Sequence, residues 1–407
     1  MRILFFLLFS LFTFSQQTKS VDFLKCDANV MPHFNSNSIN GIVSYEFKVN
    51  SVIDTIRIDA KNIYFNEVQI NGKKVEYKNN DKELLLFEGF KIGKNKLSIV
   101  YNCMPKQTMY FVGTQSDFQI WTQGQGRYTS HWLPSFDDVN EKVIFNISFE
   151  LDYRLSFYSG ISNGELNFKK EKKKKTVGYW SIYEPKNGVY RFKMKKPMSS
   201  YLVMLAIGRF DREITKSKSG TPLEFYIDMN DVSKFEPTYR YSKQIFDYLE
   251  QEIGVKYPWG IYRQVPVRDF LYAGMENTTS TIFSQDFVVD SIGFNDKNYI
   301  NVNAHELAHQ WFGDLITAQS GKHHWLQEGF ATYYALLAEK EVFGDDYFYN
   351  ELYDYALQLR SAAKTDTIPV MNEKASSLSF YKKGAWALHT LREDIGAKNF
   401  QKVVKTY

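Results

Sequence analysis

Residues 303–313 read Asn-Ala-His-Glu-Leu-Ala-His-Gln-Trp-Phe-Gly, and this stretch decides the second half of the fold. Its pattern predicts a helix, on which His305 and His309 lie four residues apart on one face, so that both imidazoles can reach one ion. Glu306 lies about 100° from His305 around the axis, near enough to act on a water there without taking a ligand position. With seven His in the whole chain, this HExxH spacing indicates a metal site. The alternative is a surface helix whose two His and Glu are incidental.

A catalytic zinc needs a third protein ligand and an open position. Glu328, within the segment WLQEGFAT at 325–332, is separated from His309 by 18 residues, which is enough for a loop and an antiparallel helix. Two imidazoles and one carboxylate leave zinc net positive, so that it can acidify water and polarise a carbonyl. The sequence therefore predicts one Zn²⁺ per chain, bound by His305, His309 and Glu328.

Three further polar residues lie close to this motif in the sequence. His323 and His324 precede Glu328, and we interpret them as loop or core histidines because the zinc already has its ligands. Asp314 follows the predicted helix. It either orients a ligand imidazole through a hydrogen bond or is a solvent-exposed carboxylate at the helix end.

Outward from the motif, the chain divides into two halves with different periodicity. From about 39 to 210, short alternating segments separated by turn signals predict an all-β sandwich. Asn71-Gly72 predicts a type I′ hairpin. The lysine-rich run 169–175 is expected to cap a second hairpin, which follows Asn163-Gly164 and Phe168. Helical spacing follows at 237–253, 301–315, 326–341, 347–361 and 381–395. The predicted domains are a β domain over 16–212 and a helix-rich catalytic domain over 213–407.

The first residues predict a secretory signal peptide over 1–15. Arg2 precedes the apolar stretch Ile3–Phe14, and small and polar residues follow it. The stretch is shorter than the roughly 20 residues of a membrane-spanning helix, so we expect an exported, periplasmic or secreted protein without a stable membrane anchor. A disulfide between Cys26 and Cys103 would persist in such a compartment, although two unpaired thiols fit the sequence equally well.

Composition excludes several classes of protein. A net charge of +4 from 50 Lys and Arg against 46 Asp and Glu does not favour nucleic-acid binding. Two Cys cannot build a disulfide scaffold or a four-thiolate zinc site. Ten Pro and 23 Gly are too few for a disordered or fibrous chain.

Four motifs in order resemble those of the M1 aminopeptidase family of gluzincins, which includes aminopeptidase N and leukotriene A4 hydrolase. The family also has HExxH and, after 18 residues, Glu. Its GxMEN motif is matched by Ala273-Gly274-Met275-Glu276-Asn277, its TQxE or TQxQ element by Thr122-Gln123-Gly124-Gln125, and its Tyr before Lys-Gly by Tyr381-Lys382-Lys383-Gly384. The resemblance implies a multidomain chain, β then α+β: a β-sandwich or saddle domain followed by a thermolysin-like, helix-rich zinc peptidase domain.

The resemblance also implies roles for single residues in an aminopeptidase that acts on peptides with a free N-terminus. Glu306 would be the general base, and Tyr381 would donate a hydrogen bond to the developing oxyanion. Glu276 would bind the substrate's α-ammonium, with Gln125 as a second acceptor. The bound peptide would also contact Ala273, Gly274, Met275 and Asn277.

Several departures from the family pattern qualify this expectation. Ala273 replaces the first Gly of GxMEN, Gln327 replaces Asn before the zinc Glu, and Gln125 stands where most of these aminopeptidases have Glu. We therefore expect a weaker or differently selective ammonium site. The family also continues beyond the point that matches Tyr407, so a C-terminally truncated chain is expected. The alternatives are a catalytically impaired or dead binding protein, a bifunctional epoxide hydrolase and aminopeptidase, and a zinc endopeptidase.

Overall fold

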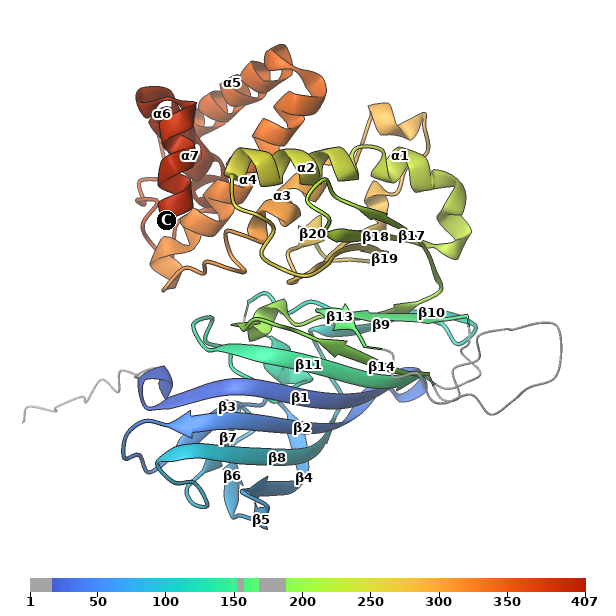
Figure 1. Cartoon of the computed structure of the whole chain (residues 1–407), viewed down its shortest axis with the longest axis vertical. Coiled ribbons are helices and arrows are strands. Elements are labelled where there is room, and N and C mark those ends of the chain that lie inside the picture. The colour runs from blue at the N-terminus through green and yellow to red at the C-terminus, as the bar shows by residue number, and fades with distance from the viewer. Residues whose placement is uncertain (1–16, 127, 152–156, 168–187) are drawn as a thin grey trace, which may run out of the picture.

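The computed structural model describes residues 17–126, 128–151, 157–167 and 188–407. The predicted signal peptide and the lysine-rich run 169–175 lie outside these ranges. The predicted fold class, a β domain followed by a helix-rich domain, is confirmed. Figure 1 shows the β domain below the helices, with a five-stranded sheet between them.

A long mixed sheet forms the body of the β domain. Its central strand β1 (Val21–His33) pairs antiparallel with β2 (Ser38–Val49) and parallel with β11 (Lys142–Leu151). Buried and exposed residues alternate along β2, because only one face of this sheet packs against the core. The other strands are β4 (Ile63–Ile70), β5 (Lys73–Lys74), β8 (Gly93–Cys103), β13 (Glu165–Leu166), β14 (Gly188–Lys193) and β15 (Met198–Ser199).

Two smaller sheets complete this domain. One contains β3 (Ile56–Asp59), β6 (Tyr77–Asn79) and β7 (Glu83–Leu86), and the other contains β9 (Met109–Thr114), β10 (Asp117–Thr122), β12 (Ser159–Ser162) and β16 (Leu205–Gly208).

The two predicted hairpins have different outcomes. Asn71 and Gly72 have φ of 52° and 78° and join β4 to β5, as a type I′ turn requires. The hairpin expected after Asn163-Gly164 agrees with the antiparallel pairing of β13 with β14, and its lysine-rich tip lies outside the described residues. Asn163-Gly164 itself passes the chain from β12 in one sheet to β13 in another. Gly164 has φ of 84°, and an added Cβ would lie 2.2 Å from the carbonyl oxygen of Lys193. This position therefore requires glycine.

The two cysteines are buried and unpaired. Cys26 lies opposite Tyr45 on β2, whereas Cys103 lies opposite Ile39 on the same strand. Six residues along a strand span about 20 Å. A disulfide needs Cα atoms within about 7 Å of each other, so this sheet register excludes the Cys26–Cys103 bond.

The five-stranded sheet opens the second part of the chain. It runs in the order β17 (Phe210–Lys216), β18 (Pro222–Asp228), β19 (Tyr262–Val267), β21 (Ser280–Ser284) and β20 (Gly274–Met275). The predicted domain boundary at 212/213 falls inside β17. β20 is an edge strand, and the loop that follows it carries Glu276.

Helices lie on the side of this sheet that faces away from the β domain (Figure 1). They are α1 (Phe235–Tyr239), α2 (Ser242–Ile253), α3 (Ile300–His309), α4 (His324–Phe343), α5 (Asp345–Ala362), α6 (Gly384–Ile395) and α7 (Ala397–Thr406). A one-turn π-helix, η10 (Ser379–Lys383), precedes α6. None of the helices in the described ranges is long and apolar enough to cross a bilayer.

Three predicted helices differ from the observed ones. The helix predicted over 237–253 is divided into α1 and α2. The one predicted over 301–315 ends early, at His309. The one predicted over 381–395 begins as the π-helix η10.

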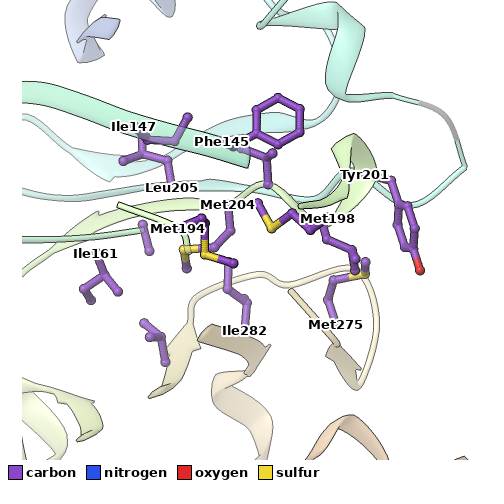
Figure 2. Packing of buried hydrophobic residues seen from close by; sticks show 14 of the residues in the cluster. Phe145, Ile147, Ile161, Met194, Met198, Tyr201, Met204, Leu205, Met275 and Ile282 are labelled. Atoms are coloured by element: carbon purple, nitrogen blue, oxygen red, sulfur yellow. The ribbon is translucent and has the colours of Figure 1, made fainter. Parts of the chain in front are cut away.

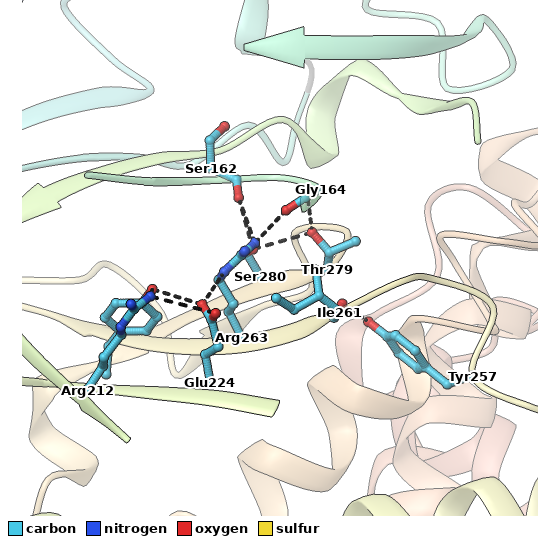
Figure 3. A network of polar contacts seen from close by, with 10 residues as sticks. Ser162, Gly164, Arg212, Glu224, Tyr257, Ile261, Arg263, Thr279 and Ser280 are labelled. Atoms are coloured by element: carbon cyan, nitrogen blue, oxygen red, sulfur yellow. Dashed lines mark hydrogen bonds and ion pairs between the residues drawn. The ribbon is translucent and has the colours of Figure 1, made fainter. Parts of the chain in front are cut away.

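The two domains share a core, and a buried arginine of the second domain donates hydrogen bonds to the first. Figure 2 shows Met198 and Met204 of the β domain beside Met275 and Ile282 of the five-stranded sheet. Flexible methionine side chains fill irregular space between two such surfaces. Nearby, Arg263 on β19 donates to the carbonyl oxygen of Gly164 at 2.6 Å and to the Glu224 carboxylate at 2.7 Å (Figure 3).

Candidate metal centre and substrate site

Helices α3 and α4 bring three donor atoms together. The Nε2 atoms of His305 and His309 lie 3.1 Å apart. Oε2 of Glu328 lies 3.5 Å from the first and 3.4 Å from the second. The structure thus brings together the three predicted ligands on two packed helices.

This triangle fits zinc. Tetrahedral bonds of roughly 2.0 to 2.2 Å place two ligand atoms about 3.3 Å apart, which is close to all three separations. Oε2 of Glu328 is buried and has no hydrogen-bond partner among the described residues. Nδ1 of His309 faces the carbonyl oxygen of Phe312 at 2.9 Å, which orients the ring and leaves Nε2 for an ion.

The three predicted ligands shift one another's pKa values. Burial raises the pKa of Glu328, but the imidazoles, first that of His309, outweigh it and hold the pKa well below its usual value. Burial lowers the pKa of His309, but the carboxylates of Glu328 and then Glu276 outweigh it and raise the pKa. Burial lowers the pKa of His305, which favours the neutral ring that a metal needs.

Glu306 lies beside these ligands and against the strand β20. It is buried, and burial is the main cause that raises the pKa of its carboxyl group. A Cβ added to Gly274 would lie 2.5 Å from Oε1 of Glu306. Glycine at 274 therefore lets the strand approach the carboxylate closely.

Tyr381 lies beside His305. Their rings are stacked, with centroids 5.6 Å apart and an interplanar angle of 4°. Burial, followed by the charge of Glu328, raises the pKa of the phenol above its usual value. The hydroxyl therefore stays protonated and able to donate a hydrogen bond.

Glu276 is a buried carboxylate near the metal donors. Its side chain is 4% exposed, and its oxygen lies within 4.8 Å of the ligand atoms of Glu306 and His309. No described residue donates a hydrogen bond to this carboxylate. A buried carboxylate is costly unless a cation or a donor pairs with it, so this group is suited to bind a cation from a ligand.

The remaining predicted substrate residues differ in their burial and in their contacts. Ala273 is exposed and Gly274 half-buried, whereas Met275 is buried and accepts a hydrogen bond on its sulfur from Gln123 at 3.8 Å. Asn277 is buried and donates to the carbonyl oxygen of Leu202 at 3.3 Å, which ties the loop to the β domain. Gln125 lies half-buried after β10, with no interaction to another described residue.

Sequence reasoning missed the role of His324. Nε2 of His324 lies 3.2 Å from Oε1 of Glu328, so His324 contacts the carboxylate oxygen that faces away from the metal donors. The interpretation as a loop or core histidine is therefore wrong. The available signal was the spacing of four residues from Glu328 on one helix.

Neither interpretation of Asp314 holds. Its side chain is 0% exposed, which excludes a solvent carboxylate. The orienting contact of His309 comes from the Phe312 carbonyl oxygen.

Each of the two domains is similar to a known family of domains. Residues 24–202 match the model of the peptidase M1 N-terminal domain, and residues 238–407 match that of the peptidase family M1 domain. Among curated relatives, leucyl aminopeptidase of Saccharolobus solfataricus is 26% identical over 387 residues, which covers 89% of this chain and 46% of the relative. Glutamyl aminopeptidase of Sus scrofa is 28% identical over 289 residues, which covers 68% of this chain and 29% of the relative. The chain thus spans less than half the length of these two relatives.

Two solved structures share the fold. Yeast LTA4 hydrolase in complex with bestatin aligns with a TM-score of 0.79 at 21% identity, covering 96% of this chain and 62% of that one. The M1 zinc metallopeptidase of Deinococcus radiodurans aligns with a TM-score of 0.74 at 18% identity, covering 95% and 86%.

Proposed function

Because the chain belongs to peptidase family M1, we propose that it is a zinc aminopeptidase, which hydrolyses the N-terminal bond of peptides. The observation that carries this proposal is the buried, unpartnered carboxylate of Glu276 beside the metal donors. A carboxylate in this position binds the substrate's α-ammonium and so selects a free N-terminus. This recognition distinguishes an aminopeptidase from an endopeptidase.

The proposed mechanism assigns a step to each neighbouring side chain. His305, His309 and Glu328 would hold one zinc ion per chain, which when bound acidifies a water molecule and polarises the scissile carbonyl. Glu306 takes a proton from the attacking water and passes it to the leaving amine. Tyr381 donates a hydrogen bond to the oxyanion that forms on the carbonyl oxygen.

Substrate recognition follows from the edge strand and its loop. Glu276 binds the ammonium group, and Gln125 supplies a second, uncharged acceptor. The chain from Ala273 to Met275 lies beside the bound peptide, with Asn277 holding the loop in place. Because Gln125 is neutral, ammonium binding depends mainly on Glu276.

Fluorogenic aminoacyl amides test this function directly. The zinc-loaded protein should hydrolyse the free-amine substrate and leave its N-acetylated form intact. Glu306→Gln should keep its zinc and lose about 10²- to 10⁴-fold in kcat, and Glu276→Gln should mainly raise KM. Glu236→Gln, which removes an exposed carboxylate paired with Arg240, is the matched control. Equal hydrolysis of both substrates would identify an endopeptidase, and no hydrolysis by the zinc-loaded protein would favour a binding protein.

We also propose that the chain is exported with loss of residues 1–15. N-terminal sequencing of the protein recovered from fractionated cells tests this proposal. A mature protein that begins near Gln16 outside the cytoplasm supports it, and an intact Met1 contradicts it.

A further inference from the structure

The loop that carries Glu276 is tied to the metal-binding helix by one side chain, Gln310. Nε2 of Gln310 donates to the carbonyl oxygens of Glu276 at 3.1 Å and Asn277 at 3.4 Å. Its Oε1 accepts from the backbone N–H of Thr279 at 2.9 Å and lies 3.1 Å from the hydroxyl of Tyr257, whose single proton also faces the carbonyl oxygen of Ile261 at 3.1 Å. Because both the amide nitrogen and the amide oxygen of Gln310 are engaged, the carboxamide is held in one orientation.

The backbone of Gln310 is held in place, as its side-chain amide is. The residue directly follows His309, ends α3 and is 0% exposed. Its backbone carbonyl oxygen accepts from Nε1 of Trp259 at 3.0 Å. The side chain therefore transmits the position of α3, and of the ligand His309, to the loop.

The loop itself is strained and depends on such contacts. Thr279 has φ of 70°, a conformation that costs a β-branched residue roughly 1 to 3 kcal/mol. The β domain holds its far end, where Asn163 donates to the carbonyl oxygen of Thr278 at 2.6 Å and the N–H of Gly164 donates to Oγ1 of Thr279 at 2.7 Å. Gln310 holds it from the metal side.

We propose that Gln310 is a positioning residue that sets the distance between the metal donors and the ammonium-binding carboxylate of Glu276. This inference rests on the proposed aminopeptidase function. In an α-amino acid, the ammonium nitrogen and the reacting carbonyl carbon are about 2.5 Å apart, separated by one carbon atom. A ligand that touches both the metal and Glu276 therefore tolerates little change in their separation, since a misplacement of about 1 Å can cost about 100-fold.

Two hydroxamates that differ only in the α-amine separate this role from a structural one. 4-Methylpentanohydroxamate presents the hydroxamate and the isobutyl group, whereas leucine hydroxamate also presents an ammonium group to Glu276. Dissociation constants are measured by calorimetry on the zinc-loaded protein. In Gln310→Met, leucine hydroxamate should bind about 10- to 100-fold more weakly, while zinc content and 4-methylpentanohydroxamate affinity stay unchanged. Equal weakening of both probes, or of neither, would overturn the proposal.

Gln119→Met is the matched control. Gln119 is also a buried carboxamide that joins the two domains, with bonds to Asp228 and Arg268, but it contacts no residue of the loop. Its loss should lower stability without changing the ratio of the two hydroxamate affinities. A change in that ratio comparable to that of Gln310→Met would show that any loosened domain contact has this effect.

Two further variants keep the test decisive. If Gln310→Met does not fold, Tyr257→Phe removes one bond to Oε1 of Gln310 and should weaken leucine hydroxamate selectively, by a smaller factor. On a Glu276→Gln background, Gln310→Met should lose its selective effect, because the two residues act in series. If the wild-type protein does not distinguish the two probes, the proposed function fails before this inference is tested.

Discussion

The two oxygens of Glu328 face different partners, and this division shows how single residues tune the metal centre. Oε2 faces the histidines of α3, whereas Oε1 lies 3.2 Å from Nε2 of His324. His324 therefore fixes the carboxylate plane and reserves one oxygen for the metal. Partners of this kind raise metal affinity by limiting the motion of the ligand.

We expect His324→Phe to weaken zinc binding by about 10- to 100-fold, because the carboxylate loses its fixed orientation. Competition with a chromogenic chelator measures this affinity. His323→Phe, in the adjacent 3₁₀ turn, is the matched control and should bind zinc like the wild type. Equal affinities in the two variants would contradict the role of His324.

Glu141 is a second residue whose environment has a measurable effect. Burial raises the pKa of its carboxyl group to about 8, although the Phe23 N–H donates to it at 2.9 Å. The folded state therefore binds more protons than the unfolded state between pH 4.5 and 8, so the free energy of unfolding falls as pH rises through this window.

Glu141→Gln should remove this dependence, since the amide does not ionise. Relative to the wild type, the variant should gain roughly a few kcal/mol of unfolding free energy between pH 5 and pH 8.5. Urea unfolding of both proteins at the two pH values measures the difference. A difference that stays constant with pH would contradict burial as the cause.

At the scale of elements, a contact between two glycines brings Tyr381 to the metal centre. A Cβ on Gly384 would lie 2.9 Å from Cα of Gly329, so α4 and the start of α6 touch backbone to backbone. The π-helix η10 ends at this contact and turns Tyr381 toward His305. A π-helical turn in a helix commonly accompanies a functional side chain in this way.

Gly384→Ala should push these two helices apart. We expect a loss of about 1 to 3 kcal/mol in unfolding free energy and a reduced kcat, because Tyr381 moves with the helix. Calorimetry and the aminoacyl amide assay measure the two effects. Gly293→Ala is the control, because its new methyl group would meet the nearest atom at an ordinary 3.5 Å. Unchanged stability in Gly384→Ala would refute the close contact.

Elements with strong local signals could be predicted, and those set by tertiary contacts could not. Two of the three donors could be predicted because helical periodicity places His305 and His309 on one face. Glu328, on α4, is predicted from its separation along the chain and from the resemblance to the family. The end of α3 at His309 depends on the contacts of Gln310 and Phe312, which the sequence does not display. The dipeptide Asn163-Gly164 is compatible both with an I′ hairpin and with a crossing between two sheets. The crossing is decided by a tertiary contact, since Asn163 bonds to Thr278 in the loop that carries Glu276.

At the scale of the whole molecule, a buried arginine joins the two domains. Arg263 is 1% exposed and pairs with Glu224 at 2.7 Å, and it donates to the carbonyl oxygens of Ser162 and Gly164 (Figure 3). These two carbonyls flank Asn163, which holds the Glu276 loop. The domain interface and the substrate site are therefore one connected network.

Arg263→Leu should destabilise the protein by about 3 to 5 kcal/mol, because Glu224 is left as a buried charge without its main partner. We also expect the single unfolding transition to separate into two as the domains lose their connection. Thermal unfolding followed by calorimetry tests both expectations. Arg240→Leu, which removes an exposed pair, should leave the unfolding transition close to that of the wild type. A single transition at the wild-type temperature in Arg263→Leu would show that the interface does not depend on this pair.

Because the two thiols are far apart in the sheet, each can report the local opening of its own strand. Burial raises the pKa of Cys26 and raises that of Cys103 to about 12, so neither is a thiolate in the closed sheet. A thiol-specific label reacts with each only when its strand opens, and its rate then reports the free energy of that local opening. Since Cys26 lies on the central strand β1 and Cys103 at the end of β8, the two labelling rates distinguish global unfolding of the sheet from fraying of one strand.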